Sequence, residues 1–344
     1  IGLDERGRKV GLLLMWIAVL VGAQPRKGKT YFARALALFA ALDPYVRLTV
    51  VDGKLSPDWD KFRLVAHRMV FGTVPNHRDN DPITHLLEAL REIKKHIESV
   101  NEFLSKLPTA ECPDGKLTRE LSRKYKQLRV WVLVMEEFQV YYETDDQAVN
   151  KEIAALLSYI MAVGPSAGVV ILSSTQKPSG IGAGDVQRLF NRYRDNHTVR
   201  FALKCGNRDV SMALLGSDAY SEGFDASALP SGAQYRGVGI LYGAADETPT
   251  VRSYLADAED AEKILTAARR HREQPARSPG TQPASPSLVR CGMCWPMSGR
   301  CSCRGRTGCT GRRSPAGWRS ECRSTTRTSR PTRSQPSSAS MYRA

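Results

Sequence analysis

The stretch that most constrains this chain is residues 19–42, VLVGAQPRKGKTYFARALALFAAL. Apolar residues lead into a loop with glycine and proline, and an Ala- and Leu-rich helical pattern follows. A buried strand, a glycine-containing loop and a helix start together form a phosphate-binding loop, in which backbone N–H groups converge on an anion. The stretch therefore predicts a strand–loop–helix unit that binds a nucleotide, against the simpler alternative of a glycine-rich turn before an ordinary helix.

The loop contains the residue types that this chemistry needs. The predicted nucleotide-binding residues are Gly22, Ala23, Gln24, Pro25, Arg26, Lys27, Gly28, Lys29 and Thr30. In such loops the lysine ammonium reaches the β- and γ-phosphates, and the hydroxyl of the next residue can ligate Mg²⁺. The motif departs from the strict pattern at Ala23, where glycine is usual, while Gly22 lies one position early. ATP and Mg²⁺ are the expected cofactors.

Further apolar runs predict more strands of the same sheet. Runs over 10–21, 46–51, 130–135 and 168–174 suit strands buried on both faces, and helices are expected between them over 29–42, 82–106 and 150–163. Weaker patterns predict strands over 66–71, 197–204, 235–242 and 249–255, helices over 183–193 and 257–272, and an irregular surface excursion over about 107–128. Alternating strands and helices predict an α/β fold with a mostly parallel sheet flanked by helices.

Two adjacent carboxylates, Glu136 and Glu137, follow the apolar run 130–135. At the end of a core strand near a phosphate-binding loop, the first can hold Mg²⁺ and the second can orient and polarise an attacking water. Aspartate is usual at the first position, so Glu136 is one methylene longer. The alternative is a charged cap on a strand that ends in solvent.

Two more strand ends are polar. Gln176 follows the run 168–174 and can sense a γ-phosphate or position water, so Lys29, Glu137 and Gln176 are the predicted catalytic residues. Asp52 follows the run 46–51 and is a further candidate, because strand ends in such sheets face the ligand crevice. Ordinary turns before Pro178 and Gly53 are the alternatives.

The net charge of +15 is concentrated at one end of the chain. Residues 275–344 contain thirteen Arg and one acid, which leaves only +3 for the rest. The overall charge is therefore weak evidence that the body binds nucleic acid. Cys112 and Cys205 are the body's two cysteines, which suits a reduced cytosolic compartment, and the six His show no metal-ligand spacing.

Residues 273–344 are rich in Ser, Pro, Arg, Gly and Cys and cannot bury a core. We interpret them as a low-complexity, disordered tail or an out-of-frame translation. A DNA-gripping basic tail is one alternative. A zinc site is another, although the cysteine spacings are irregular. At the other end, the run 10–21 is too short to span a bilayer, no signal peptide is visible, and the start at Ile1 suggests that an upstream part is missing.

Five motifs together resemble the motor domain of the FtsK/SpoIIIE DNA translocases, nearest to the branch of actinobacterial conjugative plasmids and integrative elements. They are VGAQPRKGKT (21–30), VDGK (51–54), LVMEEFQ (133–139), SSTQKPS (173–179) and HTVRFALKCGNRD (197–209). The resemblance covers about residues 1–272. It implies a RecA-like P-loop NTPase that assembles as a hexameric ring, threads double-stranded DNA and moves it by hydrolysing ATP.

The resemblance also implies roles for single residues. Thr30 and Glu136 would hold Mg²⁺, and an arginine from a neighbouring subunit would complete the site, for which Arg200 and Arg208 are the candidates. Ser211 stands where many members of the family have an arginine. Possible DNA contacts are Arg188, Arg192, Arg194 and Lys204. Full-length relatives lie at the cytoplasmic face of the cell membrane through N-terminal helices, so this piece is expected to be cytoplasmic.

Two other function classes are compatible with a phosphate-binding loop. One is a P-loop ATPase that acts as a partner switch in partitioning or secretion without moving DNA. The other is a small-molecule kinase, which gains little from a water-activating carboxylate such as Glu137. The leading prediction is an ATP-dependent double-stranded DNA translocase that serves conjugal transfer of a plasmid or integrative element.

Overall fold

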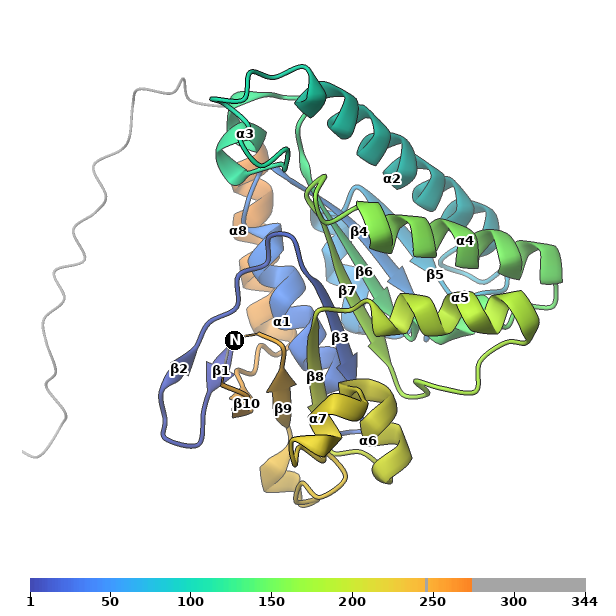
Figure 1. The fold of residues 1–344 in the computed structure, drawn as a ribbon, viewed down its shortest axis with the longest axis vertical. Coiled ribbons are helices and arrows are strands. Elements are labelled where there is room, and N and C mark those ends of the chain that lie inside the picture. Colours follow the sequence, from blue (N-terminus) through green and yellow to red (C-terminus); the bar gives the residue numbers. More distant parts are fainter. Residues whose placement is uncertain (245–246, 274–344) are drawn as a thin grey trace, which may run out of the picture. The chain divides into compact units, whose positions relative to one another are not determined.

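The structure is a computed structural model that describes residues 1–244 and 247–273 (Figure 1). Its strands are β1 Gly2–Leu3, β2 Lys9–Val10, β3 Ala18–Gly22, β4 Val46–Asp52, β5 Arg68–Phe71, β6 Val130–Glu136, β7 Val169–Thr175, β8 Val199–Leu203, β9 Val238–Tyr242 and β10 Thr250–Ser253. Its α-helices are α1 Lys29–Ala41, α2 Pro82–Ser105, α3 Arg119–Lys124, α4 Gln147–Val163, α5 Gly184–Asp195, α6 Arg208–Leu215, α7 Ser217–Ser221 and α8 Ala258–Glu273. The 3₁₀ segments are η1 Pro57–Leu64, η2 Phe138–Tyr142 and η3 Ala233–Tyr235.

The described strands form one sheet in the order β2-β1-β10-β9-β8-β3-β7-β6-β4-β5. The pairs from β8 to β5 are parallel, whereas β9, β10, β1 and β2 continue the sheet antiparallel. Buried parallel strands read as continuous apolar runs, which is why β3, β6 and β7 were recognisable in the sequence. The predicted α/β fold with a mostly parallel sheet flanked by helices is confirmed.

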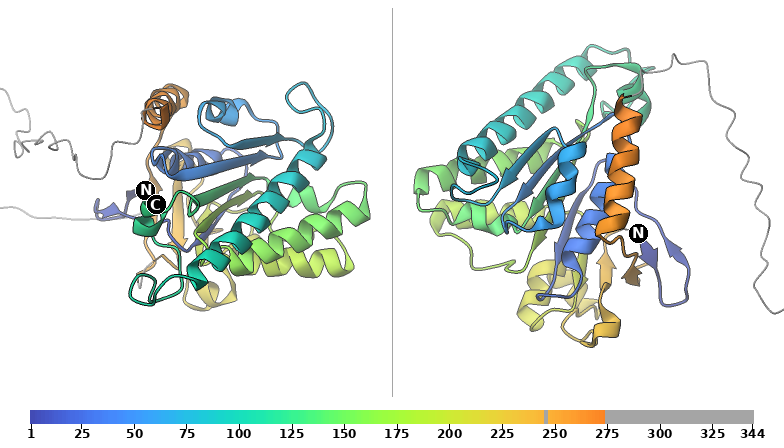
Figure 2. Two further views of the ribbon diagram at one scale, coloured as in Figure 1. Left: turned by 90° about the horizontal axis from the view of Figure 1, so that it is seen from above. Right: turned by 180° about the vertical axis from the view of Figure 1, so that it is seen from behind.

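Helices cover both faces of the sheet (Figure 2). On one face α1 packs on β3, β4, β6 and β7, and α8 packs on α1 and η1. On the other face α2, α4 and α5 lie side by side. The core between these layers includes Trp131 of β6 and a stacked pair of rings from Phe32 and Phe201, 4.1 Å apart.

The strand register aligns the polar ends of the parallel strands. Asp52 of β4 pairs with Glu136 of β6, Glu136 pairs with Ser174 of β7, and the next residue, Thr175, pairs with Gly22 of β3. Parallel strands present their carboxyl ends at one edge of the sheet. Hydrogen-bond register thus brings residues from distant parts of the sequence to the phosphate-binding loop.

The prediction of one strand over residues 10–21 is wrong for its first part. The strand β3 begins only at Ala18, and residues 11–17 are irregular. Trp16 adopts a left-handed backbone conformation with φ 62°, which a strand cannot accommodate, and its indole N–H donates to the Leu117 carbonyl at 2.8 Å. The apolar residues before β3 therefore cover the fold from outside the sheet.

The segment 107–128 is more ordered than an irregular surface excursion. It contains α3, which begins after Thr118, whose hydroxyl accepts the Leu121 N–H at 3.3 Å. Leu117, Leu121 and Leu128 are buried against the core. In the sequence these three leucines are separated by polar residues, so they did not form a recognisable helical pattern.

Predictions for residues 274–344, including their cysteines, lie outside the described residues.

Candidate active site

Steric crowding explains where the two glycines of the phosphate-binding loop stand. A Cβ on Gly22 would lie 2.1 Å from the Leu214 side chain, whereas Ala23 fits into the core with 2% of its surface exposed. Gly28 has a φ of 104°, and a Cβ there would lie 3.0 Å from the Gly237 nitrogen. The early glycine is therefore the one that this fold requires, and alanine is compatible with the next position.

Lys29 begins α1 and lies among the strand ends. Its ammonium is 2.7 Å from Glu136 Oε1 and 2.8 Å from Glu137 Oε1, and it donates to Ser174 Oγ at 3.2 Å. The lysine is 5% exposed. A buried ammonium that contacts two carboxylates offsets their mutual repulsion and holds both acids at the loop.

Thr30 and Glu136 form the part of the site that fits Mg²⁺. The Thr30 hydroxyl donates to Glu136 Oε1 at 2.8 Å, and Ser174 Oγ donates to Glu136 Oε2. Hydroxyl and carboxylate oxygens are the ligands that Mg²⁺ prefers, and the ion usually takes its remaining ligands from phosphates and water. The described residues contain no cluster of three or more His, Cys, Asp and Glu side chains suited to a metal ion.

Glu137 is turned toward Lys29 by an uncommon backbone conformation. Its φ and ψ are 51° and 50°, in the left-handed region, so the chain leaves β6 sharply and enters η2. The carboxylate accepts hydrogen bonds from the Gln176 side-chain amide at 2.6 Å, the Gln176 backbone N–H at 3.0 Å and the Gln139 amide at 2.9 Å. Such strained conformations collect at functional sites, so this geometry keeps Glu137 a candidate functional residue.

The sequence analysis missed Gln139. Its amide oxygen accepts a hydrogen bond from Thr175 Oγ1 at 2.7 Å while its N–H group donates to Glu137. This fixes the orientation of the amide and connects η2 to the end of β7. The only sequence signal was a polar residue two positions after the acids, within an otherwise apolar 3₁₀ turn.

The pKa values of the two strand-end acids, Glu137 and Asp52, shift in opposite directions. Burial alone would raise the pKa of Glu137, but the Lys29 charge and the hydrogen bonds from Lys29, Gln139 and Gln176 lower it below its usual value. Burial raises the pKa of Asp52 to about 6, with Glu136 adding to the rise. Lys29 and the amide donors thus favour the ionised form of Glu137, whereas burial disfavours the ionised form of Asp52.

Asp52 has a structural role in this arrangement. Its oxygens accept the backbone N–H groups of Lys54 at 3.0 Å and Ser56 at 2.7 Å. The adjacent Gly53 N–H donates to the Glu136 carbonyl at 2.9 Å. The geometry therefore supports the turn interpretation of Asp52 that the sequence left open.

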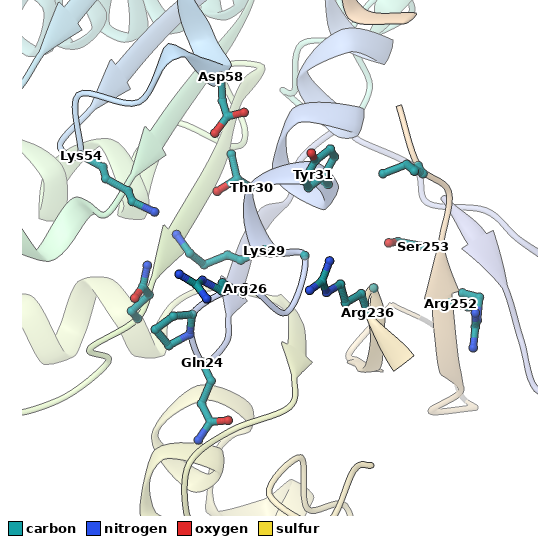
Figure 3. A pocket seen from close by; sticks show the side chains of 15 residues that line it. Gln24, Arg26, Lys29, Thr30, Tyr31, Lys54, Asp58, Arg236, Arg252 and Ser253 are labelled. Carbon is teal, nitrogen blue, oxygen red and sulfur yellow. The ribbon is translucent and has the colours of Figure 1, made fainter. Parts of the chain in front are cut away.

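A cavity of about 640 Å³ lies at the loop (Figure 3). It is lined by Gln24, Pro25, Arg26, Gly28, Lys29, Thr30, Tyr31, Lys54, Asp58, Gln176, Arg236, Gly237, Arg252, Ser253 and Leu255. Six of the nine predicted loop residues and Gln176 thus share one cavity with residues of the closing strands, whereas Gly22, Ala23 and Lys27 do not line it. The closing-strand residues have no motif, so sequence reasoning missed them.

The candidate trans arginines do not line this cavity. Arg200 donates to the carbonyls of His197, Leu214 and Asp195 at 3.2, 3.2 and 2.8 Å. The guanidinium of Arg208 lies over the Tyr220 ring, 3.9 Å from its centre. Within one subunit, therefore, neither residue contacts the site.

Ser211, the position at which the sequence resemblance implies an arginine, lies in α6 and is buried. Its Oγ accepts the Ala226 N–H at 2.9 Å. Its role is to hold the following loop. An arginine would not fit this buried position without displacing that loop.

Comparisons with known proteins were decisive only for the fold. The sequence matches no protein-family model and no curated protein. Among solved structures, the pCW3 conjugation coupling protein TcpA, a monomer form with ATPγS, superposes with a TM-score of 0.55 at 14% identity over 73% of this chain and 65% of that one. The cytoplasmic domain of the Type VII secretion ATPase EccC from Thermomonospora curvata gives 0.58 at 19% identity, over 81% and 31%.

EssC ATPases 2 and 3 from Geobacillus thermodenitrificans give 0.54 at 16% identity, over 79% of this chain and 47% of that one. This chain has the fold of the FtsK/SpoIIIE-type P-loop ATPases. The resemblance seen in the motifs is thereby confirmed at the level of the fold. The chain spans less than two thirds of each of these neighbours.

Proposed function

We propose that this chain is an ATPase motor that moves double-stranded DNA during conjugal transfer of a plasmid or integrative element. The observation that carries the proposal is a nucleotide-sized cavity lined by Lys29, Thr30 and Gln176. Two carboxylates, Glu136 and Glu137, contact the Lys29 ammonium beside it. Tandem acids beside a P-loop lysine are suited to hydrolysis by water. The fold of a conjugation coupling protein supports the same assignment.

Glu137 is the proposed general base. Its lowered pKa keeps it ionised, and Gln139 and Gln176 fix its orientation. Phosphate oxygens at the loop would compete for the Lys29 ammonium, which would release one lone pair of Glu137 Oε1 to accept a proton from water while Gln176 stays bound to the same oxygen. Gln176, hydrogen-bonded to the same carboxylate, would sense the γ-phosphate.

Mg²⁺ would be held by Thr30 and Glu136. When bound, the ion neutralises charge on the β- and γ-phosphates. In this structure Glu136 Oε1 accepts hydrogen bonds from both the Lys29 ammonium and the Thr30 hydroxyl. The extra methylene of glutamate lets the side chain reach across from β6 to the start of α1, which compensates for the missing aspartate.

In a hexameric ring on DNA, a neighbouring subunit would supply the trans arginine, and basic residues of each subunit would contact the DNA. Of the two proposed trans arginines, Arg208 is exposed and donates no hydrogen bond to a described residue, whereas Arg200 is engaged by three carbonyls. Among the possible DNA contacts, Arg194 donates to the Pro178 carbonyl and Lys204 to the Ser227 carbonyl. The remaining two, Arg188 and Arg192, lie exposed on α5.

Attachment to the membrane would come only through a part that precedes this chain, with the motor on the cytoplasmic side. No helix in the described ranges is at once long and apolar enough to cross a bilayer.

The alternative function is a partner-switching ATPase in secretion, which is favoured by the likeness to EccC and EssC. The two alternatives differ in whether DNA accelerates hydrolysis.

The test is the rate of ATP hydrolysis by the full chain, with and without long double-stranded DNA. A DNA motor should hydrolyse ATP faster on DNA at concentrations where mass photometry shows rings. The substitution Glu137→Gln should abolish this rate, whereas Glu102→Gln on the exposed face of α2 should not. Hydrolysis that assembled rings perform equally with and without DNA would favour the partner switch.

A further inference from the structure

The cavity extends past the phosphate-binding loop to a second end that the catalytic residues do not occupy. In Figure 3, Lys54 and the Lys29 ammonium lie on one side of the α1 start, whereas Tyr31, Ser253 and Arg236 lie on the other. A nucleotide whose phosphates bind the loop must place its nucleoside on one of these sides. The acids and Gln176 occupy the first side, so the nucleoside is left with the second.

Tyr31 offers a fixed aromatic surface at this second end. The guanidinium of Arg34 lies over its ring, 4.7 Å from the centre. Arg34 is itself 2% exposed and donates to the Ala256 carbonyl at 2.6 Å. One face of Tyr31 is thereby occupied, while the side chain as a whole stays 40% exposed and lines the cavity. Leu255, 70% exposed, adds apolar surface beside it.

Arg236 is held against the phosphate-binding loop by its neighbours. The Gly237 N–H donates to the Lys27 carbonyl at 2.9 Å, and the Lys27 ammonium donates to Ser231 O and Oγ at 2.8 and 2.9 Å. Gly237 O in turn accepts the Ser253 N–H at 2.9 Å. These contacts attach the segment 231–237 to both the loop and β10, so the position of Arg236 follows the loop.

The charge of Arg236 is available for an anion. No ion pair joins Arg236 or Arg252 to an acid in the part of the chain that the structure describes. Five cations line the cavity, Arg26, Lys29, Lys54, Arg236 and Arg252, against one lining carboxylate, Asp58. Lys29 is paired with Glu136 and Glu137, which leaves four cations facing Asp58. Such an excess of positive charge is suited to a polyphosphate.

We propose that these residues form the nucleoside end of the site: Tyr31 and Leu255 pack on the base, and Arg236 binds the α-phosphate. The inference rests on the proposed function, because it requires ATP phosphates on the loop. Lys27 then has a role apart from phosphate binding, since its side chain attaches the Arg236 segment to the loop. The two ends of the cavity thereby divide recognition and hydrolysis between them.

The experiment is calorimetric titration of the full chain with Mg²⁺-ATP, Mg²⁺-ADP and Mg²⁺-tripolyphosphate. Tyr31→Ala should weaken ATP binding about tenfold and leave tripolyphosphate binding within twofold, because only ATP carries a base to stack. Tyr31→Phe should restore ATP binding. Arg236→Met should weaken ATP and ADP equally, since both carry an α-phosphate. Matched controls are Tyr235→Ala and Arg123→Met, whose wild-type side chains are exposed and do not line the cavity.

Several outcomes would overturn the inference. If Tyr31→Ala bound ATP as tightly as the wild type and had the wild-type melting temperature, that result would by itself overturn the base-packing role. If Arg236→Met bound ATP more weakly but ADP normally, the α-phosphate role of Arg236 would be overturned. A wild-type chain that binds neither ATP nor tripolyphosphate would overturn the proposed function together with this inference. Loss of tripolyphosphate binding in Tyr31→Ala would show that the substitution damages the loop, and would also contradict a base-stacking role.

Discussion

The two ends of the cavity are built differently. At the catalytic end, Lys29, Glu136 and Glu137 are buried and joined by short contacts between strand ends. At the other end, Tyr31, Arg236 and Leu255 are exposed, and backbone hydrogen bonds of Gly237 together with the Lys27 ammonium fix the segment. Buried charge has to be fully paired, whereas a surface that exchanges nucleotide has to stay open. Substitutions should therefore affect rate at the first end and affinity at the second.

The largest expected effect is on the rate at the catalytic end. Glu137→Gln should lower kcat by roughly 10²–10⁴-fold, the usual contribution of a positioned general base. Binding of Mg²⁺-ATP should persist, because Lys29 and Thr30 are intact. Steady-state kinetics paired with calorimetry measure both quantities. A variant that loses nucleotide binding to the same extent as its rate would show that Glu137 binds substrate and does not act as a base.

The positioning residue Gln139 should have the next largest effect. Gln139→Ala removes a donor from Glu137 and should lower kcat roughly tenfold to a hundredfold, as loss of an orienting partner does. The same loss raises the pKa of Glu137, so the acid limb of the kcat–pH profile should move to higher pH. Gln139→Glu makes a sharper contrast, since it puts a second carboxylate beside Glu137. An unshifted acid limb in Gln139→Ala would assign it a purely structural role.

Acid should destabilise the fold beneath the catalytic end. Burial lowers the pKa of His197 to about 3. In the neutral ring, Nε2 accepts a hydrogen bond from Ser173 Oγ at 2.9 Å. The stability that neutral His197 contributes is complete above the unfolded-state pKa near 6.5 and is lost as pH falls from there toward 3. By pH 5 the loss is about 2 kcal/mol.

Denaturant titrations at pH 7.5 and pH 5 measure this loss. In His197→Gln the free energy of unfolding should change less between the two pH values, because the replacement does not titrate. Ser173, Tyr193 and Arg194, which form hydrogen bonds with the His197 ring, stay unchanged in that variant. An equal drop in the variant and the wild type would exclude His197 as the source of acid sensitivity.

The smallest effect is expected at the open end. Leu255→Ala should raise the Kd for ATP about threefold, because part of an apolar contact is lost while the loop is untouched. The kcat at saturating ATP should stay within twofold of wild type. If kcat fell along with affinity, the two ends would be coupled, and the division between rate and affinity would fail.

Much of the catalytic end could be predicted from the sequence, for a simple reason. In a parallel sheet the carboxyl ends of strands meet at one edge, so polar residues after the apolar runs of β6 and β7 were bound to approach the loop. Glu136, Glu137 and Gln176 were found in this way, and the structure brings them together with Lys29 and Thr30.

Other features depended on contacts that no local pattern encodes. Gln139 contacts Glu137 across a turn in which Glu137 adopts a left-handed conformation. Trp16 also adopts a left-handed conformation, so the predicted strand over 10–21 does not form before Ala18. Arg236 lies at the cavity because β9 and β10 extend the sheet antiparallel and carry the preceding segment back to the loop. Each placement is a consequence of tertiary pairing.

The sequence by itself determined the fold class and the loop chemistry, since hydrophobic periodicity and a glycine-lysine-threonine turn are local properties of the chain. Tertiary structure alone decided in which direction the pKa values of Glu137 and Asp52 shift and which residues of β9 and β10 line the cavity. It also decided that Asp52 caps a turn. These outcomes depend on burial and on neighbours distant in sequence, because pKa values and cavity walls arise only when separate strands are packed together.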